Sequence, residues 1–411
     1  MKSTTTLPTL SIVVTLALAA SQAVAQTTET REQELQAKRA EKAQQMEPAR
    51  LSRVERVLLS LENDRLLERL LNPPEGFYPR VGHVTPGSSF SLGVGYRRPR
   101  LLGERAVLSA SAMGSLKKYW VAEARLLMPR LADDTAQVEV YAQRFSWPEE
   151  AFFGLGPDSL RRSQANFSLE NTLVGGSGAL RAGRLLSLGG RVEHMLPRAG
   201  RGQAAGLPTI GDIFPTAQAP GLGDATSFGR FEAFADFNYR EPVMNPRRGG
   251  RYYVSYAAYD DLDLDRYGFR RIEVDLQQYF PFLMDRRVFA FHALLSASDA
   301  GGGQEVPFYL MRSLGGPDDL RGFRRHRFRD RNILLLQAEY RWEVFTAVDA
   351  ALFVDAGQVA PRVEDLSLGR LETDYGFGLR FGSVNGVFLR IEGAFGSRDG
   401  KHFIFRLGHV F

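Results

Sequence analysis

The sequence contains no cysteine among its 411 residues. Neither disulfide bonds nor thiolate metal sites can therefore hold the fold together, and the chain can cross an oxidising compartment without forming wrong bridges. Histidine is also scarce, and the six histidines lack the spacing of metal ligands. They are His83, His194, His292, His326, His402 and His409. The sequence thus predicts no metal site and no cofactor.

A large net charge and long apolar runs are missing as well. Lysine and arginine number 52 against 47 acids, a formal charge of +5, which is too small for this length to favour a nucleic-acid partner. The apolar run from Leu7 to Ala20 falls short of the roughly 20 residues of a spanning helix. With Lys2 before it and Ala23-Val24-Ala25 after it, residues 1–25 instead predict a secretory signal peptide cleaved after Ala25.

Residues 26–75 differ in composition from the rest of the chain. They are charged and rich in alanine and glutamine, and residues 51–71 space leucine and valine three and four apart. This pattern predicts an amphipathic helix that ends at Asn72-Pro73-Pro74. The helix could lie on its own protein, on a membrane surface or across a barrel mouth, and the near balance of acids and bases slightly favours the first. We expect a helical periplasmic extension over 26–75.

From Phe77 onward apolar and polar residues alternate, as in Phe403, Phe405, Leu407, His409 and Phe411 of the last segment. A soluble sandwich turns its apolar face inward, whereas a membrane barrel turns it to lipid and lines its lumen with charged residues and glycine. Two features favour the barrel. The strands run to about ten residues, the length of a tilted membrane crossing, and tyrosine and tryptophan lie near strand ends, as in interfacial girdles.

Strand counting gives fifteen clear strands between residues 88 and 411, and a single-chain barrel of this kind requires an even number. Gly76 to Val84 supplies the sixteenth; it is short and contains Pro79, which makes it a poor hydrogen-bonding neighbour. The sequence therefore predicts an all-β fold: a 16-stranded antiparallel transmembrane β-barrel over residues 76–411 in the cell outer membrane. Its closing strand is marked by Phe403, Phe405, Leu407, Gly408 and Phe411.

One segment is far more cationic than the rest. Six arginines lie between Arg321 and Arg331, beside one histidine and one acid. Its Leu320-Arg321-Gly322-Phe323 resembles the [V/L/I]-R-G-[F/Y] signature of the BamA/TamA bacterial surface-antigen superfamily. FVDAG, residues 353–357, is similar to the family's F-x-D-x-G motif, FIFRLGHVF to its closing strand, and residues 100–129 to its early strand pair. The resemblance extends from Phe77 to Phe411.

The resemblance implies an internal-loop lock. In that family the arginine-bearing loop folds into the barrel, and its tip contacts acids on the inward faces of the following strands. Alternation places Glu339 and Asp355 on such faces. Arg321 is then expected to pair with both acids through its planar fork, Gly322 to take a turn conformation closed to other residues, and Phe323 to pack against the barrel wall. We expect the remaining arginines to form a cationic loop base near lipid phosphates.

The resemblance also implies a function: insertion or translocation of a protein or lipid substrate through a weak seam between first and last strands. The expected partners are outer-membrane lipids and nascent outer-membrane or secreted proteins. Most members carry POTRA modules before the barrel, and about fifty residues are too few for one, so we expect a variant lacking them. The alternative is a passive pore or structural surface protein. An enzyme is disfavoured, because Gly156 to Leu160 (GPDSL) lacks the strand–turn–helix context of a nucleophile.

Overall fold

The computed structural model of the chain describes residues 75–283, 286–345, 348–383 and 386–406. The expected signal peptide, nearly all of the expected 26–75 extension, and Leu407, Gly408 and Phe411 of the expected closing strand lie outside these residues. No helix in the described part of the chain is long and apolar enough to span a bilayer.

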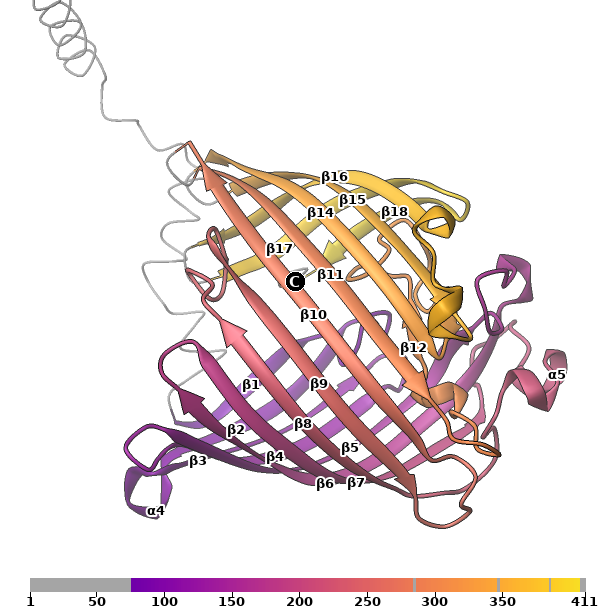
Figure 1. The fold of residues 1–411 in the computed structure, drawn as a ribbon, viewed down its shortest axis with the longest axis horizontal. Coiled ribbons are helices and arrows are strands. Elements are labelled where there is room, and N and C mark those ends of the chain that lie inside the picture. The colour runs from indigo at the N-terminus through magenta and orange to yellow at the C-terminus, as the bar shows by residue number, and fades with distance from the viewer. Residues whose placement is uncertain (1–74, 284–285, 346–347, 384–385, 407–411) are drawn as a thin grey trace, which may run out of the picture. The chain divides into compact units, whose positions relative to one another are not determined.

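Sixteen strands form one antiparallel sheet in which each strand pairs with its neighbours in chain order. The predicted fold class, an all-β 16-stranded antiparallel barrel, is confirmed, and each predicted strand is present. Figure 1 shows the sheet curving so that the indigo-to-magenta strands face the orange-to-yellow ones. The strands are β1 (Gly76–Gly82), β2 (Ser91–Arg100), β3 (Ala106–Ser115), β4 (Trp120–Leu131), β5 (Ala136–Phe152), β6 (Ala165–Ala182), β7 (Leu186–Arg201), β8 (Phe228–Asn238), β9 (Gly249–Asp261), β10 (Phe269–Phe282), β11 (Arg287–Asp299), β14 (Asn332–Phe345), β15 (Val348–Ala360), β16 (Glu372–Ser383), β17 (Gly386–Ser397) and β18 (Gly400–Arg406).

Short elements occupy the connections. Two further strands, β12 and β13, pair only with each other, and the helices are single turns. They are α4 (Leu101–Glu104), η1 (Arg161–Ser163), α5 (Ile210–Ile213), η2 (Thr216–Gln218), η3 (Phe308–Leu310), β12 (Arg312–Leu314), β13 (Phe328–Asp330), η4 (Val363–Asp365) and η5 (Leu368–Arg370). The long connections, among them 202–227 and 300–331, emerge at one end, which we call the long-loop mouth; the other end is the short-turn mouth.

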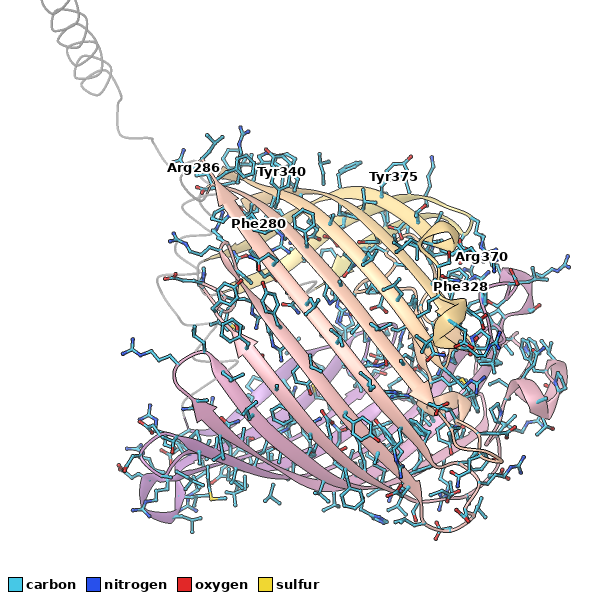
Figure 2. All side chains as sticks on the ribbon, in the orientation of Figure 1. Phe280, Arg286, Phe328, Tyr340, Arg370 and Tyr375 are labelled. Carbon is cyan, nitrogen blue, oxygen red and sulfur yellow. The ribbon has the colours of Figure 1, made fainter. Side chains whose placement is uncertain are left out.

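The alternation along each strand sorts side chains between the two faces of the wall. On β15, Leu352 and Val354 are exposed, whereas Phe353 and Asp355 between them are buried in the barrel. Apolar residues thus face outward, as a lipid-facing wall requires. Aromatic rings gather at the short-turn mouth, where Tyr340 stacks on Trp342 with ring centroids 5.3 Å apart. Figure 2 shows Phe280 and Tyr340 near Arg286, in the turn at this mouth.

The apolar core lies inside the barrel near the long-loop mouth, where connection 300–331 packs against the inner wall. One cluster joins Phe308 and Tyr309 of this connection to Phe152 and Phe167 of β5 and β6. A second joins Val306 and Met311 to residues of β7 to β10. Burial of these apolar side chains stabilises the connection in place by about 1.5–3 kcal/mol for each large one.

The connection 239–248 folds over the lumen at the short-turn mouth. It follows β8, yet Arg247 Nη2 lies 3.0 Å from both carboxylate oxygens of Asp349 on β15. Strands β10, β11 and β14 separate β9 from β15 in the sheet, so this ion pair spans part of the opening. Arg240 Nη1 also donates to Gln277 Oε1 on β10, at 2.9 Å.

The seam between the first and last strands differs from every other junction. Within residues 75–406, apart from the short gaps, β1 pairs with β2 and β18 pairs with β17, but no ladder joins β1 to β18. Pro79 lies in the middle of β1, opposite Val94 of β2, and cannot donate a backbone hydrogen bond.

Candidate internal-loop site

The site is built on residues 300–331, which we call the internal loop. Its strands β12 and β13 form a hairpin that contacts β14 and β15. The tip, residues 315–327, turns back at Gly315, where φ is +110° and a Cβ would lie 2.3 Å from the carbonyl oxygen of Arg324. A side chain is excluded at this position by both strain and space. The tip is thereby directed into the barrel.

Arg321 lies at the centre of the tip and is held by wall carboxylates. Its Nε and Nη2 donate to the two oxygens of Asp355, each at 2.7 Å, and Nη1 donates to Glu339 Oε1 at 2.7 Å. The guanidinium also lies 3.4 Å from the ring centroid of Phe353. The structure thus brings Arg321, Glu339 and Asp355 together, on the loop, β14 and β15.

These three side chains have no exposed surface. Burial alone opposes the charge, but the Asp355 and Glu339 carboxylates raise the pKa of Arg321 above its ordinary value. Removing one partner from such a buried pair typically costs about 3–5 kcal/mol, because it leaves an uncompensated charge. The bidentate geometry requires arginine, since a lysine ammonium cannot offer two parallel donors.

More charged residues complete the arrangement, and sequence reasoning did not assign them to it. Glu339 also accepts from Arg380 Nη2 at 2.5 Å and Arg341 Nε at 2.7 Å. Glu392 on β17 lies 3.4 Å from Arg321 Nη1 and 3.2 Å from Arg390 Nη1. Their signal was present in the alternation, because inward positions carry charges on four consecutive strands, β14 to β17.

The expected reason for Gly322 is wrong. Its backbone is not in the left-handed region, where Gly315 and Gly316 are found. Glycine is required because the tip approaches the wall: a Cβ on Gly322 would lie 2.5 Å from the Asp374 Cβ on β16. Phe323 is buried in a cluster with Leu320 and Phe328 of the loop and Ile333, Leu335 and Val359 of the wall.

The expected cationic loop base near lipid phosphates is also wrong for Arg327 and Arg329, which are both buried inside the barrel. Arg327 is buried and donates from Nη1 and Nη2 to Ser159 Oγ and Ser159 O, both at 2.7 Å. Arg329 Nη1 donates to the Phe308 carbonyl at 2.9 Å, and burial lowers its pKa to about 10. Ser159, the serine of the GPDSL segment, therefore holds the loop.

The sequence matches the Omp85 superfamily domain over residues 101–411. The chain belongs to the Omp85 superfamily. The predicted resemblance to BamA/TamA barrels is thereby confirmed, and Omp85 barrels of this kind are outer-membrane proteins. No curated protein matches the chain.

Solved structures share the fold of this Omp85 chain at low sequence identity. BamA from Haemophilus ducreyi lacking POTRA domains 1–3 superposes with a TM-score of 0.62 and 16% identity, covering 81% of this chain and 69% of that one. CdiB from Acinetobacter baumannii has a TM-score of 0.52 and 13% identity, covering 81% of this chain and 59% of that one. CdiB from Escherichia coli has a TM-score of 0.53 and 14% identity, covering 80% of this chain and 61% of that one. The chain thus spans about three fifths of the two CdiB chains.

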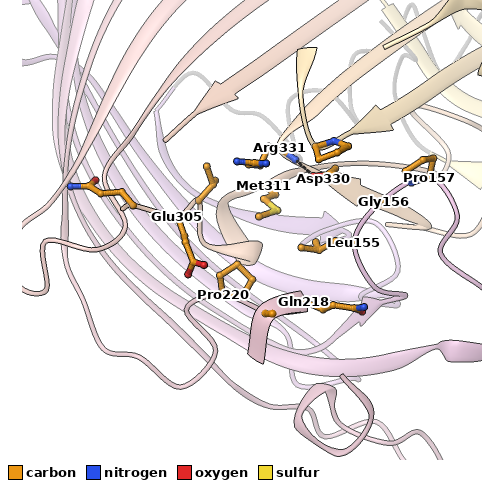
Figure 3. Close-up of a pocket in the computed structure, with 13 residues that line it drawn as sticks. Leu155, Gly156, Pro157, Gln218, Pro220, Glu305, Met311, Asp330 and Arg331 are labelled. Atoms are coloured by element: carbon orange, nitrogen blue, oxygen red, sulfur yellow. Dashed lines mark hydrogen bonds between the residues drawn. The ribbon is translucent and has the colours of Figure 1, made fainter. Parts of the chain in front are cut away.

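Two cavities of the Omp85 barrel border the internal loop. One of about 480 Å³ lies at the long-loop mouth and is lined by residues such as Leu155, Gln218, Glu305, Met311 and Asp330 (Figure 3). The second, of about 330 Å³, lies at the seam, which makes it the more informative. It is lined by His83, Pro86 and Gly87 after β1, by the loop tip and by residues 402–406 of β18. Phe403 and Phe405 are 88% and 70% exposed, so this strand keeps its aromatic face outward.

Proposed function

We propose that this Omp85 barrel inserts or translocates protein at the seam between β1 and β18. The observation that carries the proposal is the missing ladder between these strands in the described residues, together with the 330 Å³ cavity at the same place. Superfamily membership supports the choice of protein as substrate, with outer-membrane lipid as the surrounding partner. The proposal assigns no catalytic residue and no cofactor.

The mechanism follows from the cost of unpaired backbone groups in lipid, several kcal/mol each. Because β1 is short and interrupted by Pro79, it can form few backbone hydrogen bonds with β18. Little free energy therefore opposes separation of the two strands at the seam. A substrate strand can then add to an exposed edge through main-chain hydrogen bonds. Meanwhile the internal-loop lock of Arg321, Gly322, Phe323, Glu339 and Asp355 keeps the wall of β14 to β17 in a fixed shape.

A cross-linking experiment tests whether the seam must open. Val81 and Phe405 are both exposed on the outer side of the two seam strands. Val81→Cys and Phe405→Cys in this cysteine-free chain can be joined by a short thiol-specific cross-linker and assayed for insertion of an outer-membrane protein into vesicles. We expect insertion to be lost on linking.

The matched control links Val94→Cys and Ala112→Cys, partners in the existing β2–β3 ladder, and should retain insertion. Full insertion by the seam-linked protein would refute the proposal. Single-channel recording separates the passive-pore alternative: the filled lumen predicts small, flickering conductance, whereas a pore gives a large and stable one.

A further inference from the structure

The internal loop reaches both edges of the seam. On the first-strand side, Arg325 Nη1 donates to the Pro86 carbonyl and Nη2 donates to Thr85 Oγ1 at 2.9 Å. Both partners lie in the connection after β1. Arg325 Nη2 is also 3.3 Å from Glu150 on β5, which places this arginine firmly against the N-terminal half of the barrel.

On the last-strand side, Asp318 accepts a hydrogen bond from Arg406 of β18 and lies 3.4 Å from Arg390 Nη2 of β17. Two further contacts hold the same hairpin. Ser397 Oγ donates to the Gly322 carbonyl, and Arg327 Nε lies 3.2 Å from the Asp399 carboxylate in the β17–β18 turn.

The 330 Å³ seam cavity lies between these two sets of contacts. Its lining includes Pro86 and Gly87 from the first-strand side, Pro317 and Arg325 from the loop, and Ile404 and Arg406 from β18. The loop tip therefore forms a wall of the cavity that connects the two edges where the described strands form no ladder.

We propose that the tip of the internal loop is a clasp across the seam, with Arg325 holding the first-strand edge and Asp318 holding the last-strand edge. This inference rests on the proposed function, because the clasp would control the opening of the seam through which substrate is proposed to pass. Release of either contact lets the edges separate, while Arg321 keeps the loop inside the barrel. One eight-residue segment, 318–325, thus contains both a permanent anchor and a releasable contact.

Solvent exposure distinguishes the anchor from the clasp. The Arg321 and Asp355 side chains have no exposed surface, whereas Asp318 and Arg406 keep 36% and 26% of theirs. A partly hydrated ion pair is weak and is screened by salt, so it breaks and re-forms readily. The buried bidentate pair does not, because separation would leave charges without water.

The test measures the seam itself, without substrate. In vesicles, the rate of cross-linking between Val81→Cys and Phe405→Cys reports how often the two edges are close. We expect Arg325→Met and Asp318→Asn each to lower this rate at least threefold. Arg325→Lys, which keeps the charge but has a single donating nitrogen, should recover part of the rate. Raising the salt concentration from 0.05 to 0.5 M should also lower the cross-linking rate of the protein with the unmodified loop.

The control is Arg312→Met, which removes another partly exposed ion pair of this loop, with Glu273 on β10, away from the seam. Its rate should stay within error of the parent. An unchanged rate in either Arg325→Met or Asp318→Asn overturns the clasp, whatever the insertion assay gives. Lower cross-linking without any insertion activity leaves the clasp standing and removes the proposed function.

Discussion

Gly322 and Asp374 face each other so closely that a Cβ on Gly322 would lie 2.5 Å from the Cβ of Asp374. The tip of the internal loop touches the wall at this point, and a methyl group cannot fit. Gly322→Ala should therefore push the tip away from β16 and lower the temperature of barrel unfolding. Measured heat-induced mobility shifts in gels would show the change.

The matched variants make this prediction specific. Removing the opposing side chain in Gly322→Ala/Asp374→Gly should restore much of the loss, because the clash disappears. Gly301→Ala, at a position with no atom within 4 Å of a Cβ, should behave as the parent. A stable Gly322→Ala variant would mean that the tip does not contact β16.

Arg321→Met should cost about 3–5 kcal/mol of unfolding free energy, since Asp355 and Glu339 would lose a buried counter-charge. Arg321→Lys should recover only part of it, because one ammonium cannot replace two parallel donors. Arg362→Met, in an exposed pair with Asp365, should cost less than about 1 kcal/mol. Urea unfolding in detergent measures all three, and equal losses for Arg321 and Arg362 would contradict the lock.

The connection at the short-turn mouth gives a separate prediction. Asp349→Asn removes the charge that holds Arg247, so residues 239–248 should cover the opening less completely and single-channel conductance should rise several-fold. Asp236→Asn, which breaks the Arg251 pair within the wall and leaves this connection alone, should change conductance little. The conductances would be indistinguishable if residues 239–248 did not restrict the opening.

Asp319 should make the loop sensitive to pH. Burial and, next, the Asp318 carboxylate raise the pKa of Asp319 to about 7, with Arg312 and His292 opposing the shift. The folded state therefore favours the protonated acid. This contribution to stability is complete below the ordinary aspartate pKa of about 3.9 and is lost as pH rises to and through 7.

Asp319→Asn, which stays neutral, should match the parent in stability near pH 4 and exceed it at pH 8. Thermal unfolding at the two pH values, with Asp318→Asn as the neighbouring comparison, measures the difference. A constant gap between Asp319→Asn and the parent across this range would show that Asp319 does not titrate in the folded barrel.

The sequence predicted the strands well, since alternation of apolar and polar residues is a local signal that β15 and β18 display without help from the rest of the chain. It also placed Glu339 and Asp355 on inward faces. Contacts across the barrel could not be predicted in this way. That Arg380 shares Glu339, or that Asp374 lies against Gly322, depends on how the loop enters the barrel. The prediction for the remaining arginines was wrong for the same reason. The charged segment alone does not show that Ser159 and Asp399 will contact it in the folded barrel.

The acids that contact Arg321 lie on β14, β15 and β17, all later in the chain than the loop itself. Apolar rings of the same loop, such as Phe308, are enclosed by β5 and β6, which come earlier. The loop therefore contacts both halves of the sheet, with its charged groups against β14, β15 and β17 and its rings against β5 and β6. We expect the sheet to close around a loop that is already in place, so that the loop acts as a template for the assembly of its own barrel.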